Sequence, residues 1–187
     1  MNNLIVSLFA LMDNSAILAG VPRGEEAFTR LVRTVTAAKG PTRVFLSFSN
    51  VDVATASFLR ESALNFRTFC RGIRKDLYPV VANANRDITD ELAALLDLKG
   101  DAIVSCGLND DGSTFDVRLL GRLEEKQKVA LRAVIDAGEA DARTLAKKYQ
   151  DAEPTAWNNR LASLVAKGIL VELRTGRAKS YKPVLEM

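Results

Sequence analysis

Hydrophobic residues in the first 118 positions form short runs, separated by stretches with helical periodicity. The runs predict strands at 4–9, 16–19, 43–48, 77–82, 102–106 and 113–117. Apolar positions spaced by three and four residues predict helices over 25–38, about 58–72 and 87–98. Strands that alternate with helices of this length indicate an α/β domain with a mixed sheet. The run at 43–48 is apolar on both sides, which indicates a central strand.

Residues that favour turns and helix ends suggest where these elements begin and stop. The 20–22 segment, Gly-Val-Pro, is expected to end the second strand. Glu25 and Glu26 are then expected in the first helical turn, where the helix dipole favours negative charge. Asp87 or Thr89 is expected to cap the helix that follows.

After residue 118 the pattern changes to three helices and a hairpin. A first amphipathic helix ends at Gly138, and Asp141 is expected to cap a second. The apolar positions of the first helix are Leu123, Val129, Ala130, Leu131, Val134 and Ile135. A turn at 150–153 leads to a third helix that begins at Pro154. A strand at 169–174, a tight turn and a strand from 178 then complete the chain. We therefore predict two domains, residues 1–118 and 119–187.

The third helix has one apolar side and one small, uncharged side. The apolar side, expected to face a core, contains Trp157, Leu161, Leu164, Val165 and Gly168. The opposite side contains Thr155, Asn159, Ala162, Ser163 and Ala166, with Asn158 and Arg160 beside it. Short hydrogen-bonding side chains without negative charge suit a helix that enters a DNA groove. We interpret it as a recognition helix.

Two further features favour contact with DNA. Asparagine is a poor helix former, so the adjacent Asn158 and Asn159 suggest another requirement, such as a bidentate pair with adenine. The hairpin carries Arg174, Arg177 and Lys179, which suit contact with phosphates. The alternatives are that the asparagines only solvate the first helical turn and that the hairpin cations only face water.

The last third of the chain resembles winged helix-turn-helix regulators, including the MarR-like group. The resemblance rests on N-N-R-L-x-x-L-x-x-K-G-I-L-V-E at 158–172, followed by G-R-x-K-x-Y at 176–181. It implies that the third helix and the hairpin are a recognition helix and a wing. The expected DNA contacts are then Thr155, Asn158, Asn159, Arg160, Ser163, Arg174, Arg177 and Lys179.

The first part of the chain resembles STAS-like domains, which are relatives of the anti-sigma-factor antagonists. The resemblance rests on the strand at 44–48 and on S-F-x-x-E at 57–61. It implies a regulatory or interaction domain with a phosphorylation switch at the strand-to-helix loop, for which Ser57 and Thr55 are the candidates. The alternative for Ser57 is a helix N-cap.

The amino-acid composition excludes several kinds of catalytic and metal-binding site. The chain has no histidine, which excludes Ser-His-Asp and Cys-His nucleophile systems and histidine-containing zinc sites. Cys70 and Cys106 lie far apart in apolar surroundings, which favours buried free thiols over a disulfide. Asp110 and Asp111 precede Gly112 and predict a β-turn, with a carboxylate metal site as the weaker alternative. Without a phosphate loop or an acid–base pair, we expect neither an enzyme nor a cofactor.

The distribution of charge and of apolar residues bears on the partners and the location of the protein. From Leu119 onward, thirteen Lys or Arg face nine Asp or Glu, a net charge of +4; the preceding residues have thirteen and fourteen, a net charge of −1. The longest apolar run near the start, Leu4–Met12, is interrupted by Ser7 and followed by Asp13, so we expect no membrane segment and a cytoplasmic location. We expect a DNA-binding transcriptional regulator whose partners are double-stranded DNA, a protein at the STAS-like domain and a second copy in a homodimer. The alternative is a protein-interaction module of the anti-sigma-factor-antagonist type that does not bind DNA.

Overall fold

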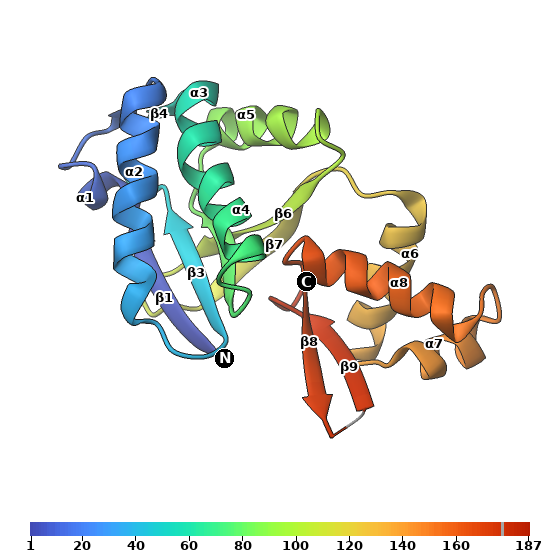
Figure 1. Cartoon of the computed structure of the whole chain (residues 1–187). Coiled ribbons are helices and arrows are strands. Elements are labelled where there is room, and N and C mark those ends of the chain that lie inside the picture. The colour runs from blue at the N-terminus through green and yellow to red at the C-terminus, as the bar shows by residue number, and fades with distance from the viewer. Residues whose placement is uncertain (177) are drawn as a thin grey trace. The chain divides into compact units, whose positions relative to one another are not determined.

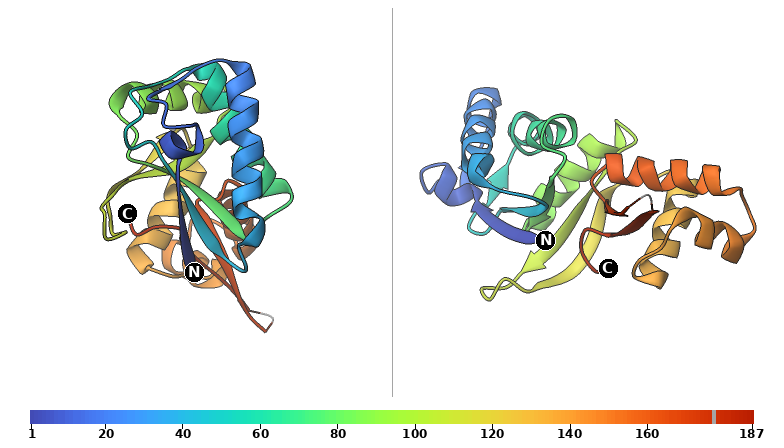
Figure 2. Two further views of the ribbon diagram at one scale, coloured as in Figure 1. Left: turned by 90° about the vertical axis from the view of Figure 1, so that its left-hand side faces the viewer. Right: turned by 60° about the horizontal axis from the view of Figure 1, so that its bottom comes forward.

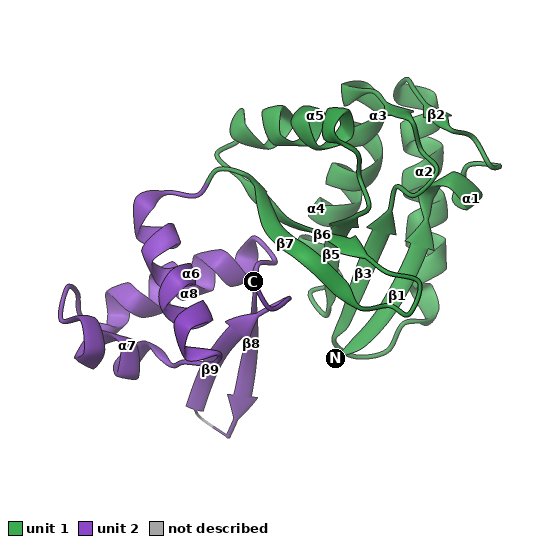
Figure 3. Cartoon of the chain, turned by 180° about the vertical axis from the view of Figure 1, so that it is seen from behind, with its two compact units in different colours: residues 1–122 green, residues 123–187 purple. Residues whose placement is uncertain are grey.

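The computed structural model describes residues 1–176 and 178–187, and the chain divides into two compact units (Figures 1 and 3). Unit 1 comprises Met1–Arg122 and unit 2 comprises Leu123–Met187. The boundary expected after residue 118 falls within the last strand of unit 1, which continues to Gly121.

Unit 1 contains a five-stranded mixed sheet in the order β1-β3-β5-β6-β7. Its strands are β1 (Asn2–Ser7), β3 (Thr42–Ser47), β5 (Leu77–Ala82), β6 (Ala102–Leu108) and β7 (Thr114–Gly121). Strands β1, β3, β5 and β6 run parallel to one another, and β7 runs antiparallel to β6. Two short strands, β2 (Ile17–Leu18) and β4 (Val53–Ala54), form a separate parallel ribbon. The mixed sheet in an α/β unit confirms the predicted fold class, and β3 lies inside the sheet as predicted.

Helices connect the parallel strands of unit 1. They are α1 (Leu8–Leu11), α2 (Val21–Thr34) with the 3₁₀ turn η1 (Val35–Ala37), α3 (Ala56–Leu59), the π-helical turn η2 (Arg60–Leu64), α4 (Asn65–Gly72) and α5 (Arg86–Asp97). In an open sheet whose parallel strands follow chain order, right-handed crossovers place the connecting helices on one face. The views in Figure 2 agree with this arrangement.

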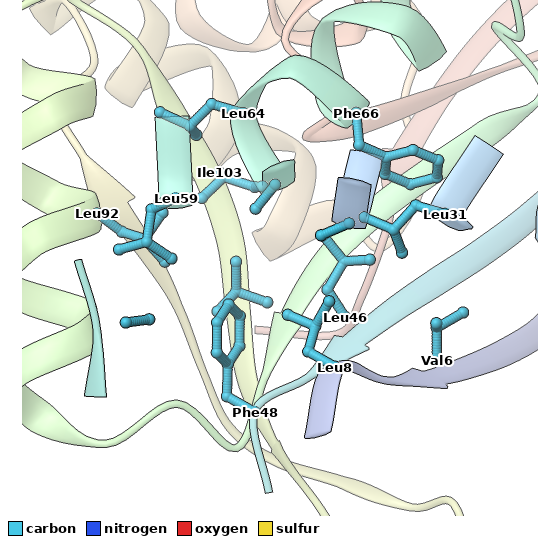
Figure 4. Packing of buried hydrophobic residues seen from close by; sticks show 14 of the residues in the cluster. Val6, Leu8, Leu31, Leu46, Phe48, Leu59, Leu64, Phe66, Leu92 and Ile103 are labelled. Atoms are coloured by element: carbon cyan, nitrogen blue, oxygen red, sulfur yellow. The ribbon is translucent and has the colours of Figure 1, made fainter. Parts of the chain in front are cut away.

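One hydrophobic cluster joins the helices to the sheet. Figure 4 shows Leu31 of α2, Leu59 of α3 and Leu92 of α5 directed toward the same interior as Leu46 of β3 and Ile103 of β6. Each of these five side chains is at most 2% exposed. Burial at this level stabilises by about 1.5–3 kcal/mol for a leucine or isoleucine side chain, so this cluster is the main source of stability for unit 1.

Several element boundaries in unit 1 differ from the predictions. The first strand ends at Ser7 rather than residue 9, because the Ser7 hydroxyl caps α1 by accepting a hydrogen bond from the Ala10 amide. The Gly20–Pro22 segment starts α2 rather than only ending a strand, since proline suits the first helical turn. Glu25 and Glu26 consequently lie beyond the first turn.

The caps of two other elements follow from side-chain geometry. Asn85, and neither Asp87 nor Thr89, caps α5: its Oδ1 accepts a hydrogen bond from the Ile88 amide at 3.0 Å. The turn predicted at Asp110 and Asp111 is confirmed, since the Gly112 amide donates to the Asn109 carbonyl at 2.9 Å. It joins β6 to β7.

Gly24 allows α2 to approach the helix formed by α3 and η2. A Cβ atom at this position would lie 2.8 Å from the Glu61 Cβ and 2.9 Å from the Phe58 carbonyl oxygen. Gly72 provides a contrast, because a Cβ there would meet nothing within 4 Å.

We expect Gly24→Ala to lower the free energy of unfolding by about 1–3 kcal/mol, because the added methyl group would force two packed backbones apart. Gly72→Ala should be neutral or slightly stabilising, since alanine is the better helix former. Urea unfolding followed by circular dichroism measures both variants. Equal effects of the two substitutions would show that the close approach at Gly24 does not matter.

A buried ion pair links α4 to the start of β6. The Arg67 guanidinium donates two hydrogen bonds to the Asp101 carboxylate, at 2.5 and 2.9 Å, and a third to the Ala102 carbonyl at 2.9 Å. The side chains are 8% and 22% exposed. The contact joins residues 34 positions apart in the sequence.

Unit 2 contains three helices followed by a hairpin. The helices are α6 (Glu125–Ala137), α7 (Ala142–Tyr149) and α8 (Pro154–Ala166), and the strands are β8 (Leu170–Thr175) and β9 (Ala178–Pro183). Gly138 ends α6 with a positive φ of 72°, and Asp141 caps α7, both as predicted. Val129, predicted to lie on the apolar side of α6, is instead 45% exposed. Ala130, Ala133 and Val134 are buried, so the inward face is rotated away from Val129.

A backbone bridge between Ala140 and Tyr181 adds a third short segment to the hairpin sheet of unit 2. The Ala140 amide donates to the Tyr181 carbonyl at 3.0 Å and the Tyr181 amide donates back at 2.9 Å. The bridge attaches the hairpin to the α6–α7 connection. It was not predicted, because a single residue carries no periodic pattern.

Within residues 1–176 and 178–187, no helix has the length and apolar character needed to cross a membrane. Cys70 and Cys106 are free and buried, as predicted, and burial raises their pKa values to about 12 and about 11.

Candidate nucleic-acid interface

Helix α8 has the two contrasting faces that its sequence predicts. Trp157, Leu161 and Leu164 are completely buried in unit 2. The exposed outer positions are Thr155, Asn159, Ala162 and Ala166. This outer face carries hydroxyl, amide and methyl groups and no charge, so it can approach a polar surface without repelling anions.

Asp151 fixes the turn between α7 and α8. Its carboxylate accepts hydrogen bonds from the Trp157 indole at 3.0 Å and from the Arg160 guanidinium at 2.9 Å. These bonds hold the pKa of Asp151 below its ordinary value of 3.8, and the bond from Arg160 has the largest effect. The guanidinium also lies over the Trp157 ring, with its carbon 4.9 Å from the ring centre. Arg160 was predicted to contact DNA, but its side chain is 14% exposed and supports the turn.

Two other predicted contacts form hydrogen bonds within unit 2. The Asn158 Oδ1 accepts a hydrogen bond at 2.9 Å from the hydroxyl of Tyr181, a residue that is 1% exposed. The Ser163 hydroxyl accepts one at 2.7 Å from the Gln127 amide of α6. These bonds connect α8 to the hairpin and to α6. Thr155 and Asn159 therefore remain the exposed polar side chains on the outer face.

The hairpin brings Arg174 and Lys179 together around one carboxylate. The two residues are direct partners in the β8–β9 pairing. Glu172 accepts a hydrogen bond from Arg174 at 2.6 Å and one from Lys179 at 3.3 Å. Burial of Glu172 opposes its ionisation, but the two cations outweigh burial and hold its pKa below 4.5. Arg177, the third predicted cation, lies outside the described residues.

No protein-family model and no curated protein matches the sequence.

Helix α7 carries two exposed cations that were not among the predicted contacts. Arg143 and Lys147 are exposed one turn apart on α7. Arg143 also lines a groove with Asn158 of α8 and with Lys179 and Tyr181 of β9. A helical wheel of α7 places both cations away from the buried Leu145, a signal that was present in the sequence.

The charged cap of α7 predicts acid sensitivity. The Asp141 carboxylate accepts hydrogen bonds from the Thr144 hydroxyl and from the Thr144 and Arg143 amides. These bonds, with that from the Thr144 hydroxyl the strongest, hold the pKa of Asp141 below its ordinary value of 3.8. Because the folded pKa is depressed, this cap stabilises above pH 3.8, and the contribution is lost as pH falls through the folded pKa.

We expect Asp141→Asn to flatten the pH dependence of unfolding below pH 4, because asparagine also caps helices well but does not titrate. Thermal unfolding followed by the fluorescence of Trp157, the single tryptophan, measures the effect in unit 2. A wild-type and a variant profile with the same slope would contradict it.

The alternative prediction for Ser57 in unit 1, that it is a helix N-cap, is wrong. Thr55, not Ser57, is the N-cap of α3, and its hydroxyl accepts hydrogen bonds from the Phe58 amide at 3.4 Å and the Gly20 amide at 3.2 Å. Ser57 lies inside the first helical turn, with its hydroxyl 3.1 Å from that of Thr55. Both residues are partly buried.

In the described part of the chain, no three His, Cys, Asp or Glu side chains cluster as metal ligands would.

Proposed function

We propose that unit 2 is a winged helix-turn-helix module that binds double-stranded DNA, and that unit 1 is a STAS-like regulatory or interaction domain. Together they would form a transcriptional regulator. The order of three helices and a hairpin supports this proposal, as does the backbone bridge that ties Ala140 to Tyr181. The observation that carries it is the uncharged, exposed outer face of α8 on a helix whose other face is fully buried.

Helix α8 would lie in the major groove with Thr155 and Asn159 toward the base edges. The groove is about 12 Å wide and admits one helix. An asparagine amide can donate to adenine N7 and accept from adenine N6, which gives sequence preference. Ala162 and Ala166 would allow the helix to approach closely, and alanine also suits contact with thymine methyl groups.

Cations beside α8 would contact the DNA backbone. Arg174 and Lys179 would approach phosphates from the hairpin, and Arg143 and Lys147 from α7. Such contacts position the protein without reading sequence. Arg160, Asn158 and Ser163 would instead position α8, because their hydrogen bonds attach it to the turn, the hairpin and α6.

Glu172 should oppose DNA binding, since it occupies the two hairpin cations that would contact phosphates. We expect Glu172→Gln to tighten binding to any duplex and to steepen the salt dependence by about one to two units, the change that one or two freed phosphate contacts would produce. Fluorescence anisotropy with a labelled duplex across a salt series measures both quantities.

Asp136→Asn is the matched control, because it removes one negative charge from the exposed end of α6, outside the proposed interface. It should change binding only slightly. Equal gains from the two substitutions would mean that net charge, and not the release of Arg174 and Lys179, controls binding.

The proposal is tested by selecting from a random duplex pool at a low and a higher salt concentration with the full chain. We expect retention of all duplexes at low salt and enrichment of a site that contains adenine at the higher concentration. No retention at either concentration would exclude DNA binding.

A second function is favoured by the modest charge of unit 2. Residues 123–187 contain twelve Lys or Arg and nine Asp or Glu, a net charge of +3, and Glu172 pairs with two of the cations. These features also fit a protein-interaction module without DNA binding. Partner binding that is insensitive to salt, together with no retention of duplexes, would favour that alternative.

Unit 1 would act by contact with a protein or by forming a homodimer, without catalysis. The two thiols are neutral because burial raises their pKa values, and the Thr55 hydroxyl is occupied in a helix cap. If Ser57 is the modified residue, its phosphate would lie at the N-terminal end of the helix formed by α3, η2 and α4, where negative charge is favoured. Mass spectrometry of the protein isolated from its own cells would detect that phosphate.

A further inference from the structure

We propose that a pocket in unit 1 binds a small oxyanion, presented by a phosphate or a carboxylate group. The pocket has a volume of about 270 Å³ and is lined by residues from the carboxyl ends of β5 and β6, from β7 and from the start of α5. Ligands of parallel α/β sheets bind outside the carboxyl ends of the strands, where helix N-termini converge. The site is independent of the proposed DNA interface, since all its residues belong to unit 1.

Ser105 is the side chain that points to a ligand. It is 3% exposed and lines the pocket. No residue in the described part of the chain forms a hydrogen bond with its hydroxyl. The hydroxyl oxygen is not fully enclosed by protein atoms but reaches the open space of the pocket, where a hydrogen-bonding partner can meet it. A ligand oxygen in the pocket would accept that bond.

Arg118 would supply the positive charge. It lies directly opposite Ser105 in the antiparallel β6–β7 pair, so the two side chains share a face with their Cβ atoms about 4.5–5.5 Å apart. Its ion pair with Asp116 is long, at 3.7 Å, and both side chains are more than half exposed. Such a pair is weak, so the guanidinium can turn to an anion held by Ser105.

The N-terminal end of α5 would add a favourable dipole, because its N-cap residue Asn85 lines the pocket. The first amides of a helix lack intrahelical partners, and the dipole of this twelve-residue helix favours an anion at that end. Asn85 satisfies the Ile88 amide and also donates to the Asp52 carbonyl at 2.9 Å. Asn83 donates to Ser49 and to the Leu108 carbonyl, both at 3.0 Å. These bonds hold the pocket wall in place before a ligand binds.

Two other lining residues limit the ligand. The Cys106 thiol stays neutral because burial raises its pKa to about 11, so it does not repel an anion. The Asp116 carboxylate does repel one, and this favours a small ligand with low charge. Asp116 lies in β7 with a positive φ of 48°, a conformation that asparagine also tolerates, so Asp116→Asn can remove the charge without straining the backbone.

The test is a titration of the full chain with sodium phosphate and, separately, with sodium acetate at constant ionic strength. Backbone amide NMR signals report the site. We expect saturable shifts at Asn85, Ser105 and Arg118 with at least one anion, and the anion that saturates identifies the ligand group. If neither anion gives saturable shifts at these residues, the proposal is overturned.

Variants separate this pocket from general attraction of anions. Arg118→Gln should weaken binding about tenfold, as expected for loss of a charge-assisted hydrogen bond, and Ser105→Ala should weaken it less. Asp116→Asn should tighten it. Arg122→Gln removes an arginine that is 82% exposed and outside the pocket, so it should leave the affinity unchanged. Equal losses in Arg118→Gln and Arg122→Gln would overturn the proposal.

Discussion

Asp101→Ala is expected to lower the free energy of unfolding of unit 1 by about 3–5 kcal/mol, because it leaves the Arg67 guanidinium buried without its carboxylate. The substitution also removes the acceptor for the Ala102 amide at 2.8 Å, where β6 begins. Urea unfolding followed by circular dichroism measures the loss. Hydrogen exchange should show it as weaker protection of the β5 and β6 amides.

Asp97→Ala is the matched control. Asp97 pairs with Arg122 at 3.2 Å, but the two side chains are 34% and 82% exposed, and such surface pairs contribute only about 0–1 kcal/mol. Comparable losses in the two variants would show that burial of the Arg67 pair is not what makes it important.

Asn159→Ala should cost about 1–3 kcal/mol of binding free energy on the preferred DNA site, with little loss on unrelated duplexes. The side chain is exposed on the outer face of α8, so its removal should not disturb the core. Equilibrium binding to the selected site and to a scrambled duplex, at one salt concentration, measures the difference.

Lys179→Ala is the contrasting variant. It should weaken binding to both duplexes alike and lower the salt slope by about one unit, because a phosphate contact carries no sequence information. If Asn159→Ala also weakened both duplexes equally, α8 would not read bases. Unit 2 would then bind DNA shape or a protein.

Local chemistry predicted much of unit 2. Gly138, Asp141 and Pro154 each act within one or two residues of their own position, so the ends of α6, α7 and α8 followed from the sequence. The buried and exposed faces of α8 also followed, since Trp157, Leu161 and their helical neighbours repeat with the period of the helix.

The hydrogen bonds that side chains of α8 form within unit 2 could not be predicted in the same way. Arg160, Asn158 and Ser163 have partners in the preceding turn, in β9 and in α6, at sequence separations of 9, 23 and 36 residues. A helical wheel shows the direction of a side chain but not the neighbour that it meets. The pairing of Glu172 with both Arg174 and Lys179 likewise depended on the register of the hairpin.

In unit 1, the sequence offers two or more nearby residues that could each cap the same helix. Thr55 and Ser57 both cap helices well, and only the backbone conformation, extended at Thr55, decides between them. Asn85 rather than Asp87 caps α5 for the same reason, because the backbone of Asn85 is extended. The bond between Arg67 and Asp101 had no local signal, because a basic residue on a helix usually faces water.

The most direct test of DNA binding by unit 2 is an NMR titration of the full chain with a random-sequence duplex at low ionic strength. We predict that signals from Thr155, Asn159, Arg143 and Lys179 change as duplex is added, and that the changes reverse when salt is raised. Spectra that stay unchanged, or changes confined to residues 1–122, would contradict the proposal.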